Sequence, residues 1–194
     1  MKRIGCLAFL VVLIFGALGA YRAFFPPRVG GAAWSQLPPQ TQKQRRAEAQ
    51  KLVEKVEEIA RDAHKNKNKT FEITASEDQL NTLLQDRLRT EKFPISDLRA
   101  GLTPGVLILQ GQLKYQGFEV PASLSGSLAA QNGALIYRID SLSISGLPAP
   151  GKVKEKAQKA IEDGLQKAFG SEKNAKIESV TIGQGQLQIA GKTG

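Results

Sequence analysis

Sulfur and imidazole side chains are scarce in this chain of 194 residues, which has one cysteine, Cys6, and one histidine, His64. A single cysteine cannot form an internal disulfide, and no cysteine-based metal site can be built from it. His64 stands beside lysines and asparagines, where a solvated side chain is a more ordinary interpretation than a ligand or a base. The sequence therefore predicts no metal and no cofactor, and it has no second histidine that could activate a serine nucleophile.

Aromatic residues are also few, at 6% of the chain, although the net charge is +9. In the C-terminal part of the chain the lysines alternate with acidic residues, which disfavours a nucleic-acid surface. The acidic residues are scattered, and the helix dipole alone explains Glu77 and Asp78 in the first turn of a predicted helix. We therefore expect a protein that is not an enzyme and does not bind nucleic acid.

One long apolar run dominates the N-terminus. Lys2 and Arg3 precede an uncharged stretch from Ile4 to Tyr21, which approaches the roughly 20 residues that a membrane-spanning helix needs. Residues 1–25 are thus predicted to be a transmembrane anchor, with a signal peptide cleaved after Gly19 as the alternative. Because such an anchor also acts as an export signal, we expect a single-pass cell-membrane protein with its large domain on the extracytoplasmic side. Basic residues after the run argue for the opposite orientation.

Residues 26–40 are rich in proline and glycine and are predicted to be a linker. Residues 41–69 follow as an amphipathic stalk, whose helix at 41–63 carries a narrow apolar stripe. This stripe is expected to pack on the domain or to pair with a second copy in a homodimer.

Residues 70–194 are predicted to form one α+β domain, a curved antiparallel sheet packed on two helices at 76–90 and 151–169. Apolar and polar residues alternate through 107–128 and again after Asn132-Gly133, a dipeptide typical of hairpin turns. The alternation changes phase near Asp140 and Ser141, which indicates a β-bulge. Ser76 and Gln79 have the spacing of a capping box at the first helix.

Several short motifs of this domain occur in an order that resembles a known group of proteins. They are Phe71-Glu72-Ile73-Thr74-Ala75-Ser76-Glu77-Asp78-Gln79-Leu80-Asn81, Gly105-Val106-Leu107-Ile108-Leu109-Gln110-Gly111, Asn132-Gly133-Ala134-Leu135, Gly146-Leu147-Pro148-Ala149-Pro150, and Val180-Thr181-Ile182-Gly183 with Gln186-Leu187-Gln188-Ile189-Ala190-Gly191. Residues 70–191 thus resemble small membrane-anchored bacterial proteins of the YpmS-like type and the actinobacterial phospholipid-binding lipoproteins. The resemblance implies a domain similar to tubular lipid-binding domains, in which a curved sheet wraps a helix and leaves an apolar groove.

Two candidate functional surfaces are expected on this domain. The resemblance implies a lipid-binding groove, which we expect to be lined by apolar side chains of the sheet and of the last helix: Leu109, Tyr115, Val120, Leu124, Tyr137, Ile161 and Leu165. Four lysines share the opposite face of that helix and are expected either to be solvated or to face anionic lipid: Lys152, Lys156, Lys159 and Lys167.

The leading hypothesis is a non-enzymatic, membrane-anchored envelope domain that binds a phospholipid, an acyl chain or another amphipathic ligand. The alternative is an anchored structural module of the envelope that binds a protein partner.

Overall fold

The computed structural model describes residues 34–65, 67–90, 95–115, 118–169 and 175–194. The described chain begins with a short 3-10 helix, η1 (Trp34–Gln36), and a long helix, α2 (Pro39–His64). Strand β1 (Lys69–Ser76) and helix α3 (Glu77–Thr90) follow. Next come β2 (Ile95–Thr103), β3 (Val106–Tyr115), β4 (Phe118–Gln131), β5 (Ala134–Ile144) and the two-residue β6 (Leu147–Pro148). Helix α4 (Gly151–Phe169) and strands β7 (Ala175–Gly183) and β8 (Gln186–Thr193) complete the fold.

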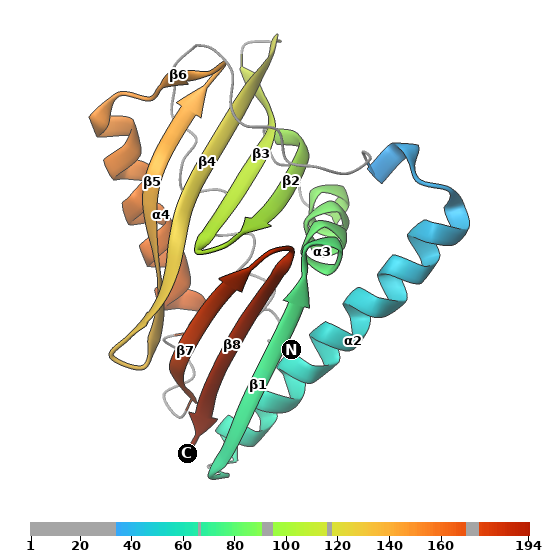
Figure 1. Cartoon of the computed structure of the whole chain (residues 1–194), viewed down its shortest axis with the longest axis vertical. Coiled ribbons are helices and arrows are strands. Elements are labelled where there is room, and N and C mark those ends of the chain that lie inside the picture. The colour runs from blue at the N-terminus through green and yellow to red at the C-terminus, as the bar shows by residue number, and fades with distance from the viewer. Residues whose placement is uncertain (1–33, 66, 91–94, 116–117, 170–174) are drawn as a thin grey trace.

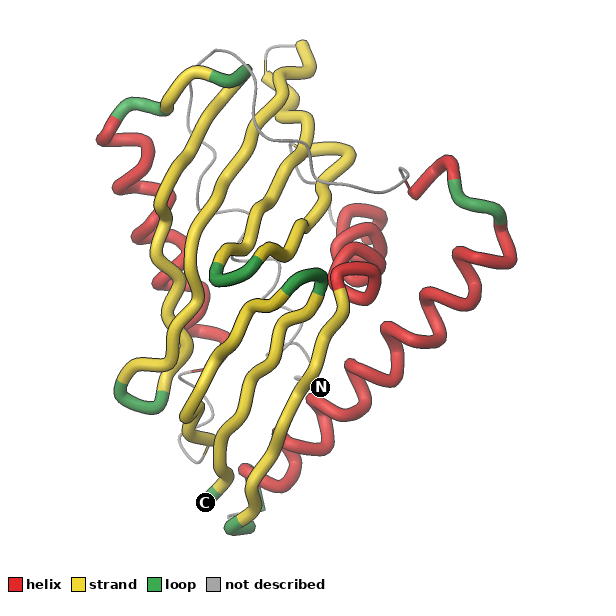
Figure 2. The backbone as a smooth tube through the Cα atoms, viewed as in Figure 1, coloured by secondary structure: helices red, strands yellow, loops and turns green. Residues whose placement is uncertain are grey.

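The strands form two antiparallel sheets, and this corrects the predicted fold class. One sheet has three strands in the order β1-β8-β7, and the other has five in the order β2-β3-β4-β5-β6. Within the described residues three α-helices accompany them, with α4 beside β5 and α2 beside β1 (Figures 1 and 2). A single curved sheet on two helices was therefore the wrong prediction, because pairing of β1 with the distant β8 leaves no mark on local periodicity.

The transmembrane part of that prediction also lacks support. Within the described residues, no helix combines the length and the apolar character needed to cross a membrane. The run at 4–25 and most of the predicted linker at 26–40 lie outside those residues.

Local predictions agree better with the structure. The capping box is confirmed, since the Gln79 backbone N–H donates to Ser76 Oγ at 3.2 Å and the Ser76 N–H donates to Gln79 Oε1 at 2.9 Å. The hairpin turn is confirmed by positive φ angles of 54° at Asn132 and 79° at Gly133. The bulge is confirmed at Asp140, because Ser125 pairs with Ser141 whereas the next residue, Gly126, pairs with Ile139.

Strand β2 was not expected from the sequence. Its alternation is interrupted by a bulge between Ser96 and Arg99, where Asp97 has a φ of 50°. Consecutive buried residues then follow near its end, at Ala100, Gly101 and Leu102. A strand that is bulged and buried on both faces does not show a period of two.

One hydrophobic core serves both sheets. Its buried side chains come from α2, α3, α4 and from strands of each sheet. Helix α2 contributes Ala49 and Leu52, with Val53 and Val56 packed beside them. The apolar stripe predicted for this helix is therefore covered by the same chain, where α2 packs on α3 and β1.

Ion pairs and hydrogen bonds fix α2 against α3. Arg45 Nη1 lies 2.8 Å from Asp78 Oδ1, and Arg46 Nε lies 3.2 Å from Asp86 Oδ1. The Arg46 guanidinium also stands 5.5 Å from the centre of the Trp34 ring, within the range of a cation–π contact.

Candidate functional site

Four described residues of the predicted groove belong to the common core, and α4 packs on β5 of the five-stranded sheet. Leu109, Leu124, Tyr137 and Ile161 are all buried in the common core. Leu109 pairs with Leu124, which pairs in turn with Leu142, so three adjacent strands place leucines in one row. The structure thus brings these residues together as core, with their side chains in contact with protein rather than with solvent.

The structure says less about the other three predicted groove residues. Val120 is half-buried near the start of β4. Tyr115 ends β3 and Leu165 lies in α4, but the side chains of both fall outside what the structure describes.

Tyr137 is the one polar group among the buried members of this set. Its side chain is 1% exposed, and its hydroxyl donates to the Leu107 carbonyl oxygen at 3.4 Å. Burial, with a smaller effect of the Asp140 charge, raises the pKa of the Tyr137 phenol well above its ordinary value. The phenol therefore stays neutral, which suits a structural role and gives no base for catalysis.

The predicted lysine surface is exposed in its described part. Lys152, Lys156 and Lys159 are exposed on α4, whereas the Lys167 side chain lies outside the description. Another lysine of this helix, Lys154, instead donates from Nζ to the Asp140 carbonyl oxygen at 2.8 Å. Among the described lysine side chains of α4, one thus bonds within the fold and three are presented to solvent.

Side-chain amides that the sequence analysis passed over hold the helices to both edges of the five-stranded sheet. On α3, Asn81 Oδ1 accepts from the Ala100 N–H at 2.7 Å and Asn81 Nδ2 donates to the Ala100 carbonyl at 2.9 Å. Gln85, one turn later, donates to the Leu98 carbonyl at 2.8 Å. On the outer side of β2, which is an edge strand, these amides thus bond to backbone groups that a neighbouring strand would otherwise pair with.

Gln158 of α4 makes the matching contact on β5. Its Oε1 accepts from the Ile139 N–H at 2.8 Å, and its Nε2 donates to the Tyr137 carbonyl at 2.7 Å. We call the Asn81 and Gln158 contacts the edge clasps. The spacing of Glu77, Asn81 and Gln85, four residues apart beside an apolar helix face, was the signal that could have revealed the first of them.

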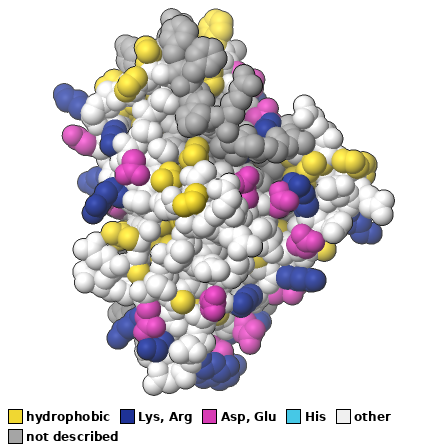
Figure 3. Space-filling model, in the orientation of Figure 1, with side chains coloured by type: hydrophobic (Ala, Val, Ile, Leu, Met, Phe, Trp, Pro, Cys, Tyr) yellow, Lys and Arg dark blue, Asp and Glu magenta, His cyan; other side chains and the backbone are white. Residues whose placement is uncertain are grey.

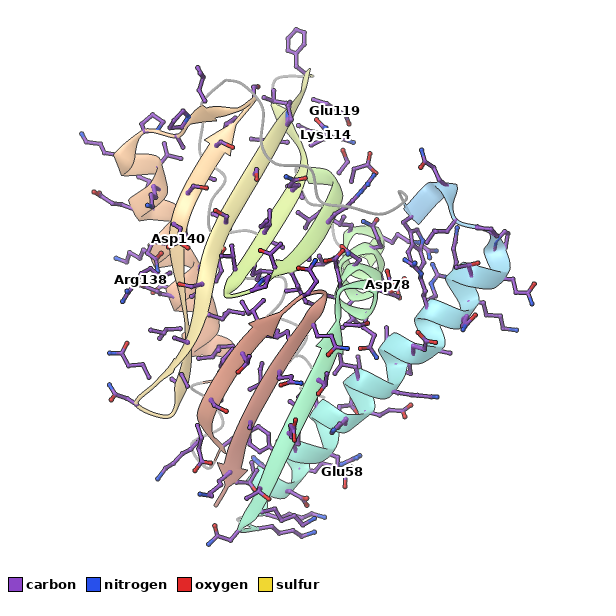
Figure 4. All side chains as sticks on the ribbon, in the orientation of Figure 1. Glu58, Asp78, Lys114, Glu119, Arg138 and Asp140 are labelled. Carbon is purple, nitrogen blue, oxygen red and sulfur yellow. The ribbon has the colours of Figure 1, made fainter. Side chains whose placement is uncertain are left out.

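Exposed apolar side chains lie elsewhere, at one end of the five-stranded sheet. Phe118 is 68% exposed and Leu147 is 46% exposed. Phe118 begins β4 beside Lys114 and Glu119, whose charged atoms are 3.9 Å apart at the end where β3 meets β4 (Figure 4). The position of Phe118 directly after Gly117, a residue type common between strands, was the sequence signal for an exposed tip.

No grouping of histidine, cysteine, aspartate and glutamate that could hold a metal occurs within the described part of the chain. Comparison with known proteins finds neither a family model nor a curated protein that matches this chain. The function is therefore inferred from the residues themselves.

Proposed function

We propose that this protein is a non-enzymatic domain of the cell envelope that lies beside a membrane and binds an acyl chain or another amphipathic ligand. The apolar run at 4–25 supports an association with the membrane, with the domain on the extracytoplasmic side.

The interface between α4 and the five-stranded sheet carries the proposal for the ligand. Leu109, Leu124 and Tyr137 of the sheet and Ile161 of the helix are buried in the same apolar core, and α4 packs on β5 beside Tyr137. An acyl chain needs such surroundings, since each buried methylene contributes about 0.8 kcal/mol. The ligand would replace contacts that the core now makes with itself, by separating α4 from the sheet.

The proposal is tested with the full chain in phosphatidylcholine vesicles that contain a trace of phospholipid with a diazirine in its acyl chain. After irradiation, we expect labelled peptides from 151–169 and 134–144 in addition to the N-terminal run. A chain labelled only in the N-terminal run, with no transfer of fluorescent phospholipid between vesicles, would overturn lipid binding. The protein-binding module would then be the better hypothesis.

A further inference from the structure

We propose that one end of the five-stranded sheet docks on the surface of an anionic bilayer. This docking end consists of Phe118 at the start of β4, Leu147 and Pro148 in β6, and Lys152 and Lys156 in α4. The inference rests on the proposed function, which places the domain beside a membrane, and it adds which surface of the domain touches the lipid.

Strand register places the two exposed apolar side chains at the same end. Leu147 pairs with Ile144, and Ile144 pairs with Ala122 of β4. Phe118 lies four residues before Ala122, so β4 continues past the end of β5 toward its tip. Figure 1 shows the start of β4 together with β6 and the start of α4 at the upper end of the molecule. In the space-filling view, separate hydrophobic side chains are visible at this upper end, and others lie over the middle of the same face (Figure 3).

Phe118 and Leu147 are exposed to an unusual degree for large apolar side chains. Among the described residues, Phe118 and Leu147 are the large hydrophobic side chains that stand exposed. Scattered exposed leucines need no explanation, but an aromatic tip and an apolar corner at the same end of one sheet can enter a bilayer interface together. Aromatic side chains are preferred at that depth.

Positive charge stands beside the apolar corner. Residues 151–159 of α4 contain four lysines and one acidic residue, Glu155. Lys152 and Lys156 are exposed in the first two turns, directly after Pro148 and Pro150. At the Phe118 tip, Lys114 and Glu119 offset each other. The charge therefore favours anionic lipid at the α4 side, while the tip supplies apolar contact.

Along β5 the backbone at this end is already paired, which argues against the addition of a partner strand there. Ser143 and Ile144 pair with β6, and the Ala149 N–H donates to the Leu142 carbonyl at 2.8 Å. Farther along β5, Gln158 occupies the edge. Insertion of the exposed side chains of the docking end into lipid needs no free backbone hydrogen bonds along this strand.

The length of the chain permits the contact. Eight residues lie between Phe25, at the end of the predicted membrane anchor, and Trp34, where the described structure begins. The nine steps from Phe25 to Trp34 reach at most about 30 Å. A run held in the membrane therefore keeps the domain within a short distance of the same bilayer.

The test uses tryptophan fluorescence in the full chain bound to vesicles of phosphatidylcholine and phosphatidylglycerol whose acyl chains are brominated. Trp34→Phe removes the native tryptophan, and Phe118→Trp then places a reporter at the tip. Ala134→Trp is the matched control, an exposed position at the opposite end of β4 and β5. We expect strong quenching of the reporter at 118 and little at 134.

Charge variants test the lysines. Lys152→Gln and Lys156→Gln should each lower the ratio of docked to undocked chains by roughly fivefold, as expected for a lysine near anionic lipid. Lys51→Gln and Lys55→Gln, on the exposed face of α2, make the same charge change away from the docking end and should leave quenching unchanged.

Cosedimentation with the vesicles separates the two proposals. A chain that pellets with vesicles but shows equal quenching at 118 and 134 would overturn the docking end and leave the membrane association standing. A chain that does not pellet would overturn both. Quenching at 118 in pure phosphatidylcholine that equals quenching in the anionic vesicles would remove the role of the lysines.

Discussion

At the scale of single residues, the most consequential contact is the crossing of Tyr137 over Gly126. A β-carbon at Gly126 would lie 2.5 Å from Tyr137 Cζ and 2.6 Å from its hydroxyl oxygen, and it would also clash with the Arg138 carbonyl oxygen. The absent side chain thus creates the space through which the ring reaches the Leu107 carbonyl. Glycine is needed at position 126 because atoms of Tyr137 and Arg138, on the neighbouring strand β5, lie too close for a side chain.

We predict that Gly126→Ala destabilises the protein by about 2 kcal/mol, because overpacking displaces a buried aromatic ring. Urea unfolding monitored by circular dichroism measures the change. Gly151→Ala is the control, since a β-carbon there meets nothing within 4 Å and the change should be neutral or slightly stabilising. Equal stability of the two variants would show that the ring moves aside at little cost.

A charged contact joins the end of α2 to the start of β1. Asp62 Oδ2 lies 2.7 Å from Lys69 Nζ, and Asp62 Oδ1 lies 3.1 Å from Lys67 Nζ. Hydrogen bonds from Lys69 and Lys67 hold the pKa of the Asp62 carboxyl below its usual value. The folded state therefore favours the charged carboxylate.

We predict that Asp62→Asn modestly lowers the melting temperature at neutral pH. The contribution of a carboxyl group with a lowered pKa is complete above its unfolded pKa and is lost as the pH falls through its folded pKa. The difference between variant and wild type should therefore vanish in acid. Melting curves across that range test this, with the exposed Glu57→Gln as control. A difference that persists in strong acid would contradict the ionic explanation.

At the scale of elements, side chains of two helices bond to the backbone at the edges of the five-stranded sheet, where no further strand pairs within the described residues. Asn81 and Gln158 each satisfy one backbone N–H and one carbonyl at opposite edges of the five-stranded sheet. Open edges invite pairing with other chains, and covering them with a helix prevents it. Polar residues on helix faces next to the core thus protect the sheet as well as stabilise it.

We predict that Asn81→Ala and Gln158→Ala each cost about 1–3 kcal/mol, the loss of two hydrogen bonds with the backbone left behind. The two clasps share no partner, so the double variant should show the sum of both losses. Urea unfolding measures these values. Gln50→Ala removes only an exposed contact with Glu54 at 3.4 Å and serves as control. If Asn81→Ala and Gln158→Ala were as stable as this control, packing alone would hold the helices at the sheet edges.

At the scale of the whole molecule, the two sheets are joined at their turns. The Gly105 N–H donates to the Ile182 carbonyl, and the Gly185 N–H donates to the Leu102 carbonyl, both at 2.9 Å. Glu77 completes the junction, because its N–H donates to the Gly185 carbonyl at 3.0 Å and its Oε2 accepts from the Leu102 N–H at 2.9 Å. The helix dipole is thus only part of the reason for an acidic residue at this position.

We predict that Glu77→Ala costs about 1.5–3 kcal/mol, since a hydrogen bond to a charged acceptor is lost. Hydrogen exchange should then show an equal fall in protection for amides of β3 and β8, because one core and one junction join both sheets. Glu77→Gln keeps an acceptor oxygen and should restore most of the protection. A fall confined to β7 and β8 would mean that the sheets open independently.

The sequence alone determined the local elements of this protein. Ser76 and Gln79 marked a helix start, Asn132-Gly133 marked a turn, and the phase change at Asp140 marked a bulge. Each depends on backbone preferences of a few neighbouring residues, which the chain carries whatever its partners are.

Tertiary structure decided which strands share a sheet and which apolar residues remain exposed. Pairing of β1 with β8, the edge clasps and the burial of Leu109, Leu124 and Tyr137 depend on residues far apart in the chain. Phe118 and Tyr137 show the difference, since both are aromatic residues in alternating strands, yet one is exposed and the other buried. Periodicity places a side chain on a face of a strand, and only the neighbouring elements determine whether that face is covered.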